Sequence, residues 1–163
     1  MRRAGRQTTP QAEGWYRVSK VGHLPEPYVR FISLWEALCA WFRDVEDISQ
    51  DARMKGWLEE NLSDWHGREL GEAGYRASVH RLKSVSAIGI MRGTEQVGEK
   101  EIANDSDFGQ IVGAIYTVRC NLMKGGKPAD PSDREIQVCN AASDVLDSIV
   151  EYLIRYREAD DGL

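Results

Sequence analysis

Apolar residues recur at helical spacing in the first half of the chain. Between Tyr28 and Val45 an apolar side chain returns every three or four residues, with arginine and aspartate outside this stripe. The pattern predicts a long helix, and its high aromatic content predicts a place at the centre of the core. Its tryptophans, Trp35 and Trp41, are therefore expected to be core side chains rather than a platform for a cofactor.

Two shorter helices are predicted next. Asp51 is a suitable N-cap for a second helix through Leu62, and the glycine-rich region 67–74 is expected to break this helix. A third helix is expected over residues 75–85, the most basic part of the chain. Residues 86–106 contain several glycines and show no sustained period, so a loop or a short strand pair is expected there.

Two long helices are predicted in the C-terminal part of the chain. The first is expected to follow a cap at Asp105 or Ser106 and to stop at the glycine pair 125–126, which favours left-handed backbone. The second is expected to start at residues 132–133 and to continue to Tyr156. Because a short turn joins these helices, we expect them to pack antiparallel.

These elements predict an all-α fold, an antiparallel bundle of about five helices. The helical domain is expected to span residues 28–157, with a tail at 158–163. Residues 1–27 mix glycine, threonine, proline and charged residues and end in a proline-rich sequence. An irregular N-terminal segment is therefore expected there.

Charge and cysteine content narrow the classes of function. The chain has 163 residues, with 21 lysines and arginines against 26 aspartates and glutamates, and a formal net charge of -5. Such a chain has no general positive field for a polyanion, so any RNA contact has to be local. The cysteines are far apart and fit neither a zinc site nor a disulfide framework, so reduced thiols and no metal or cofactor are expected.

The hydropathy of the chain also bears on its location. No segment approaches the roughly 20 apolar residues that span a bilayer, so no contact with a membrane is expected. The arginines near the N-terminus are followed by polar residues where a secretory signal has an apolar stretch. We therefore expect a cytoplasmic protein.

One arginine lies beside the apolar stripe of the fourth predicted helix. Arg119 follows Tyr116 by three positions and precedes Met123 by four. A guanidinium keeps its charge in proteins, so a buried one requires a carboxylate, a carbonyl or a phosphate. One interpretation is an internal ion pair with Glu36, which interrupts the apolar run of the first helix. The other is a role in holding a phosphate.

The C-terminal end of the same helix carries further polar side chains. Asn121 and Lys124 lie in its last turn, and Lys127 follows the glycine pair. A lysine at a helix C-terminus complements the helix dipole, which explains Lys124 when it is considered alone. Together with Arg119, however, these residues provide three cations and an amide near one helix end. Such a group is able to hold a phosphodiester.

The segment Ile115–Lys127 resembles the signature helix end of HEPN-type domains, in which an arginine and a polar residue precede a histidine and a Gly-Gly-Lys sequence. The segment Arg30–Phe42 is similar to the first core helix of these domains. The resemblance implies a helical bundle that forms a homodimer, with two arginine-bearing helix ends facing each other across an RNA-cleaving site. It further implies an RNA-directed protein of a prokaryotic-type toxin or defence system, for which an antitoxin or effector partner protein is expected.

The resemblance assigns catalytic positions to Arg119, Asn121 and Lys124. Arg119 and Asn121 match the family pattern, whereas Lys124 stands where the family has histidine. A lysine with a reference pKa of about 10.4 stays protonated at neutral pH. It can stabilise the charge of a phosphorane but is a poor base. The site is therefore expected either to cleave RNA slowly without a metal or to bind RNA without cleaving it.

Glu36, Tyr116 and Lys127 are expected to support this site. The alternative hypothesis is a HEPN-derived dimerisation or regulatory module without catalytic activity, in which Arg119 serves an ion pair. A hydrolase of small phosphates has no motif in the sequence. Of the histidines, His23 and His66 are expected in surface loops. His80, inside the third predicted helix, is the single candidate to replace the histidine of the motif.

Overall fold

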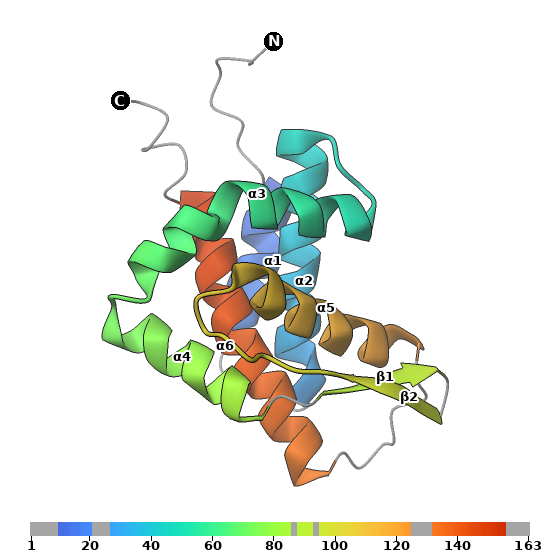
Figure 1. Cartoon of the computed structure of the whole chain (residues 1–163). Helices are drawn as coiled ribbons and strands as arrows, with labels where there is room; N and C mark the ends of the chain where they lie inside the picture. Colours follow the sequence, from blue (N-terminus) through green and yellow to red (C-terminus); the bar gives the residue numbers. More distant parts are fainter. Residues whose placement is uncertain (1–9, 21–26, 86–87, 93–94, 125–131, 156–163) are drawn as a thin grey trace.

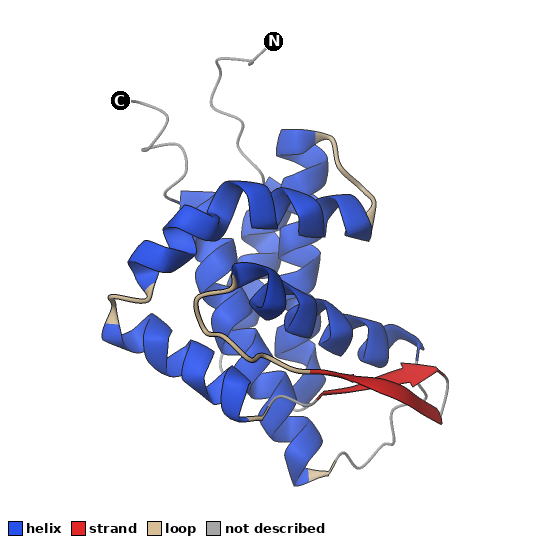
Figure 2. Cartoon of the chain, viewed as in Figure 1, coloured by secondary structure: helices blue, strands red, loops and turns tan. Residues whose placement is uncertain are grey.

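The computed structural model of the protein describes residues 10–20, 27–85, 88–92, 95–124 and 132–155. Within these residues the chain forms six α-helices, one π-helical turn and a two-stranded hairpin (Figures 1 and 2). The prediction of an all-α bundle is confirmed. The tail predicted at 158–163 lies outside the described residues.

Helices α2 (Pro27–Trp41) and α6 (Asp133–Arg155) lie side by side at the centre of the bundle (Figure 1). Helix α1 (Pro10–Lys20) packs along α2, and α4 (Ala73–Ser84) packs against α6. The apolar stripes of α2 and α6 are buried, as their periodicity predicts. Their largest fully buried side chains are Phe31, Leu34, Leu38, Leu146, Ile149 and Leu153.

A second pair of helices covers this centre. Helix α3 (Asp51–Glu69) packs against α5 (Phe108–Lys124), and the π-helical turn η1 (Phe42–Glu46) leads from α2 towards α3. Helix α6 contacts α2 more extensively than α5. Helix α6 packs against α5 as well, so the expected contact between the two C-terminal helices is present.

A network of charged side chains explains why α6 pairs with α2. Arg30 of α2 lies 2.7 Å from Asp144 and 3.4 Å from Asp147, both on α6. Arg81 of α4 lies 3.3 Å from Asp144, and the Tyr16 hydroxyl of α1 donates a hydrogen bond of 3.3 Å to Asp147. Two carboxylates of α6 thus fix the positions of three other helices.

The N-terminal segment is partly helical, so the prediction of an irregular segment over 1–27 is wrong for residues 10–20. Ala12, Tyr16 and Ser19 of α1 are buried, at spacings of four and three. Only two of these three side chains are apolar, which explains why periodicity did not reveal the helix. Residues 1–9 and 21–26 lie outside the described part of the chain.

Helix α3 extends beyond Leu62, where it was expected to end, and the break expected within residues 67–74 is present. The helix includes Gly67, ends at Glu69, and is followed by a short turn before α4. Its N-cap residue is Gln50, so the prediction that Asp51 caps it is also wrong. Asp51 is instead the first helical residue, and its carboxylate contacts Arg119 of α5.

The N-cap of α5 differs from the prediction, whereas the start of α6 agrees with it. The Asp107 carboxylate accepts a hydrogen bond of 3.2 Å from the Gln110 N–H, so Asp107 caps α5 rather than Asp105 or Ser106. For α6 the expected start is confirmed. The Ser132 hydroxyl accepts a bond from the Glu135 N–H, and the Glu135 carboxylate accepts one from the Ser132 N–H, which forms a reciprocal capping box.

The strand pair expected within 86–106 is present. Strand β1 (Ile88–Arg92) pairs antiparallel with β2 (Glu95–Lys100), with an irregularity between Ile90 and Met91. The hairpin lies beside α5, and β1 contacts this helix more extensively than β2 does (Figure 2). The hairpin thus borders the helix that carries the sequence motif.

His66 is buried in α3 rather than placed in a surface loop, so the expectation for this residue is wrong. Its Nε2 lies 2.7 Å from the backbone oxygen of Asp105, and its Nδ1 lies 2.7 Å from the Tyr75 hydroxyl. Because a carbonyl oxygen only accepts, Nε2 carries the proton and Nδ1 accepts from Tyr75. Both ring nitrogens are therefore satisfied by a neutral imidazole. Burial lowers the pKa of His66.

This lowered pKa predicts a loss of stability in mild acid. The unfolded chain takes up a proton at a higher pH than folded His66 does, so the stabilisation is complete above about pH 6.5 and declines below it. The decline approaches about 1.4 kcal/mol per pH unit, which denaturant unfolding at pH 7.5, 6.5 and 5.5 can measure. His66→Gln is expected to flatten this dependence.

The control for this experiment is His80→Gln. His80 is an exposed residue of α4 that lies 2.7 Å from the Asp105 carboxylate. The neighbouring Lys83 lowers the pKa of Asp105, so this carboxylate stays charged over the whole range tested. If His66→Gln keeps the full decline of the unfolding free energy, the buried imidazole is not its source.

Candidate functional site

Arg119 lies on α5 at the contact with α2 and α3. Its Nη1 atom is 3.1 Å from the Asp51 Oδ2 atom of α3, and its guanidinium carbon is 5.9 Å from the centre of the Trp35 ring. The side chains of Arg119 and Asp51 are 23% and 24% exposed. The expected position beside the apolar stripe and the expected ion pair are confirmed. The partner, however, is Asp51 and not Glu36.

The ion pair uses only part of the hydrogen-bonding capacity of Arg119. A guanidinium has five N–H donors in a planar fork. In the described residues, Asp51 faces one terminal nitrogen, while the Arg119 Nε atom is buried and has no hydrogen-bond partner. A buried donor without a partner costs free energy and calls for an acceptor such as water or a bound anion.

Two further side chains lie next to this arginine. Tyr116, one helical turn before Arg119, has its ring centre 6.3 Å from that of Trp35. The Lys55 Nζ atom of α3 is 5.8 Å from the centre of the Tyr116 ring. The site is therefore assembled from three helices. Two cations flank a pair of aromatic rings.

The thiol and the phenol at the site are both protonated at neutral pH. Burial, with the nearby charges of Glu36 and Asp51, raises the pKa of Cys39 to about 12. A hydrogen bond with Cys120, together with desolvation, raises the pKa of Tyr116. Neither group is a ready base or nucleophile at neutral pH. The free thiols Cys39, Cys120 and Cys139 agree with the expectation of unpaired cysteines.

Asn121 does not join Arg119 in one site. Its amide nitrogen donates a hydrogen bond of 2.7 Å to the Gly89 carbonyl, and its amide oxygen accepts one of 3.2 Å from the Met91 N–H. Residues two positions apart on a helix project about 200° apart, so Asn121 faces the hairpin and Arg119 faces α2 and α3. The expectation that both side chains hold one phosphate is therefore wrong. Asn121 anchors β1.

The remaining residues of the motif are only partly described. Lys124 is the last residue of α5, and the position of its side chain is not described. Lys127 lies outside the described residues. Glu36 is half-buried on α2, where its charge acts on Cys39.

No described histidine reaches Arg119. His66 is bonded to Tyr75 and to the Asp105 backbone, and His80 is paired with the Asp105 carboxylate. Asp105 precedes α5, whereas Arg119 lies roughly 16 Å further along this helix. His80 is therefore not a replacement for the histidine of the motif. His23 lies outside the described residues.

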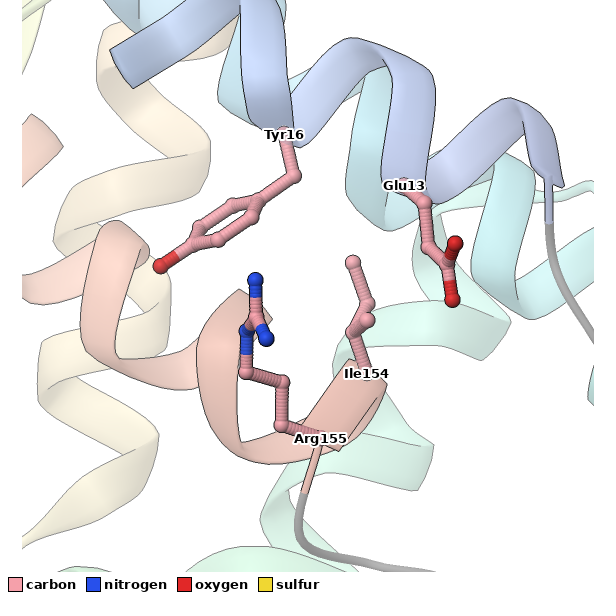
Figure 3. Close-up of a pocket in the computed structure, with 4 residues that line it drawn as sticks. All are labelled: Glu13, Tyr16, Ile154 and Arg155. Atoms are coloured by element: carbon pink, nitrogen blue, oxygen red, sulfur yellow. The ribbon is translucent and has the colours of Figure 1, made fainter.

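A separate hollow of about 320 Å³ lies between α1 and the end of α6 (Figure 3). It is lined by Glu13, Tyr16, Ile154 and Arg155. The Arg155 guanidinium points towards the Tyr16 ring, with 5.9 Å between its carbon and the ring centre. The sequence motif contributes no residue to this hollow, and periodicity gave no signal for it.

Metal sites and membrane-spanning helices are two further features for which the described residues give a result. Among them, no group of three or more histidine, cysteine, aspartate or glutamate side chains is arranged to hold a metal ion. No described helix is both long enough and apolar enough to cross a membrane. Comparison of the chain with protein-family models, with curated proteins and with solved structures finds no match.

The bonds of Asn121 to β1 predict a structural effect of its removal. Asn121→Ala leaves the Gly89 carbonyl and the Met91 N–H without their partner, so the free energy of unfolding is expected to fall by about 1–3 kcal/mol. Amide hydrogen exchange at Met91 should accelerate. Asn140→Ala, at an exposed position of α6, is the control and should leave both quantities unchanged. Unaltered exchange at Met91 in Asn121→Ala would contradict the anchoring role.

Proposed function

We propose that this protein is an RNA-directed protein that binds RNA phosphates at Arg119, as the resemblance of Ile115–Lys127 to the HEPN signature implies. The observation that supports this proposal is the incomplete satisfaction of Arg119. The Arg119 side chain is partly exposed, and its guanidinium contacts one carboxylate through one nitrogen and has a buried Nε–H without a partner among the described residues.

A phosphate suits the terminal N–H groups of Arg119 that Asp51 leaves unused. Two parallel N–H groups of a guanidinium match two oxygens of a phosphate, and such charge-assisted hydrogen bonds are stronger than neutral ones. Trp35 lies beside the guanidinium, at a distance within reach of a cation–π contact, and Asp51 pairs with it. The arginine is thus partly pre-organised, which lowers the entropic cost of holding a ligand.

Asp51 has two opposing effects on this function. Its carboxylate orients Arg119 in the free protein, and it competes with a phosphate for the same cation. An anion that binds has to displace this carboxylate or share the guanidinium with it. Binding is therefore expected to be weaker than the charge of Arg119 alone suggests, and to depend on salt.

The chemistry of the neighbours favours binding over fast cleavage. Attack by a ribose 2′-hydroxyl requires a base, and the raised pKa values of Cys39 and Tyr116 keep both groups protonated. Lys124, at the position of the family histidine, carries a charge that stabilises a phosphorane without accepting a proton. We therefore propose slow, metal-independent cleavage at most. A homodimer in a toxin or defence system is the setting that the resemblance implies.

A second candidate function is a dimerisation or regulatory module derived from the same fold. It is favoured by the two hydrogen bonds of Asn121 to the hairpin and by the ion pair of Arg119 with Asp51. In this case both residues of the motif stabilise the fold, and RNA is not a ligand.

The two candidates predict different results for Arg119→Ala. If Arg119 binds phosphate, affinity for single-stranded RNA of mixed sequence is expected to fall at least tenfold, since hydrogen bonds to charged groups contribute about 1.5–3 kcal/mol. Fluorescence anisotropy with labelled RNA measures this change. Arg68→Ala, at an exposed position of the same protein on α3, is the control for general charge. Wild-type affinity in Arg119→Ala, with a lower melting temperature, would favour the structural module.

Asp51→Asn is expected to raise the affinity for RNA, whereas Arg119→Ala is expected to lower it. Removing the competing carboxylate is expected to raise RNA affinity on the order of fivefold, because two charges 4 Å apart interact by about 1 kcal/mol in water. The melting temperature should fall at the same time. Asp64→Asn removes an exposed carboxylate elsewhere on α3 and serves as the control. Equal gains in affinity for both variants would show a general effect of net charge.

A further inference from the structure

A second cation lies beside the Arg119 site without a place in the sequence motif. Lys55 of α3 is partly buried, and its Nζ atom is 5.8 Å from the centre of the Tyr116 ring. In the described residues this ammonium takes part in no ion pair. Lysines on a folded surface are commonly explained by a carboxylate partner or by a helix C-terminus. Lys55 lies in the second turn of α3, far from the helix C-terminus, and the carboxylates four residues away on either side, Asp51 and Glu59, form no ion pair with it in the described residues.

The helix spacings place Lys55 and Arg119 along one line. Asp51 and Lys55 are four residues apart on α3, and Tyr116 and Arg119 are three residues apart on α5. These spacings put each pair on one face of its helix, about 5–6 Å apart. Because α3 packs against α5, the contacts Asp51–Arg119 and Lys55–Tyr116 lie next to each other on the seam between the two helices.

The surroundings of Lys55 limit where such a line can extend. Its stem borders a small apolar hollow together with Trp35, Leu58 and Tyr116, which leaves the charged end at the surface. One turn further along α3, Glu59 packs against Gly109 of α5. A carboxylate therefore follows Lys55 on the seam. The cations of this stretch are Arg119 and Lys55, and Asp51 and Glu59 are their acidic neighbours.

We propose that Lys55 is the second phosphate-binding residue of the site, so that an RNA strand follows the seam between α3 and α5 from Arg119 past Tyr116 to Lys55. This inference rests on the proposed RNA-binding function and extends it to a second helix. Lys55 contacts the phosphate as a flexible point charge, whereas Arg119 holds its phosphate through a fixed fork. The contact is with the backbone and carries no information about base sequence.

The experiment compares Lys55→Met with Arg53→Met on the full chain. Methionine keeps an apolar stem over the hollow and removes the charge. Arg53 is an exposed cation two residues earlier on the same helix, on a different face. Binding of labelled single-stranded RNA is measured by anisotropy at several salt concentrations. Each lost phosphate contact is expected to reduce the slope of log K against log salt by about 0.7.

The expected result is a several-fold loss of affinity and the reduced slope in Lys55→Met, similar for RNAs of different sequence. Arg53→Met should retain the wild-type slope. Lys55→Arg, which keeps a positive charge at this position, should also show the wild-type slope. Circular dichroism and the melting temperature check that each variant is folded. If Lys55→Met does not fold, Lys55→Gln takes its place in the experiment.

Two outcomes separate this inference from the function on which it rests. If Arg119→Ala loses affinity and slope while Lys55→Met keeps both, Lys55 is not a phosphate ligand and the proposed function stands. If neither variant changes RNA binding, both proposals are overturned. An equal change of slope in Arg53→Met and Lys55→Met would also overturn the role of Lys55, because the effect would then come from general charge.

Discussion

The pairing of Arg30 with Asp144 and Asp147 is the interaction on which the arrangement of the bundle depends. Arg30 and Asp144 are partly exposed, whereas Asp147 is largely buried, and a buried charge is stable only when it is paired and hydrogen-bonded. Asp147 is buried and meets both Arg30 and the Tyr16 hydroxyl, while Asp144 meets Arg30 and Arg81. Apolar stripes would allow several rotations of α6 against α2. The positions of these charges select one of them.

The face of α2 that results from this arrangement creates the candidate site. With Arg30 fixed against α6, Trp35 is turned towards α5, where it meets both Tyr116 and Arg119. The permanent charge of Arg119 then requires an anion at the edge of the aromatic pair. Asp51 provides that anion in the free protein. The guanidinium that stabilises the contact between α3 and α5 is thus the same group to which the proposed function assigns the binding of phosphate.

Local pattern was sufficient for the elements whose signal lies within one segment. The helices α2, α5 and α6, the start of α6 near Ser132 and the strand pair follow from periodicity, caps and glycines. Helix α1 was missed because its buried face combines alanine, tyrosine and serine. His66 was misplaced because a histidine next to glycine reads as a loop, whereas its partners Tyr75 and Asp105 come from other elements.

The site was predictable only in its central residue. A charged side chain beside an apolar stripe requires a partner, and this requirement identified Arg119. The identity of the partner depends on how α3 lies across α5. The sequence alone therefore indicates Asp51 as a helix cap and Glu36 as the partner of Arg119. Lys55 carries no local signal at all, since its position matters only once α3 and α5 are in contact.

The two hydrogen bonds of Asn121 have a consequence for the solubility of the protein. The Gly89 carbonyl and the Met91 N–H point away from β2, towards the edge of β1 at which a third strand could pair. One helix amide occupies these backbone groups and closes that edge of the sheet. The other strand, β2, carries exposed glutamates at 95 and 99, and such charges discourage the addition of a foreign strand. A small hairpin on the surface of a helical protein is in this way protected from joining sheets of neighbouring molecules.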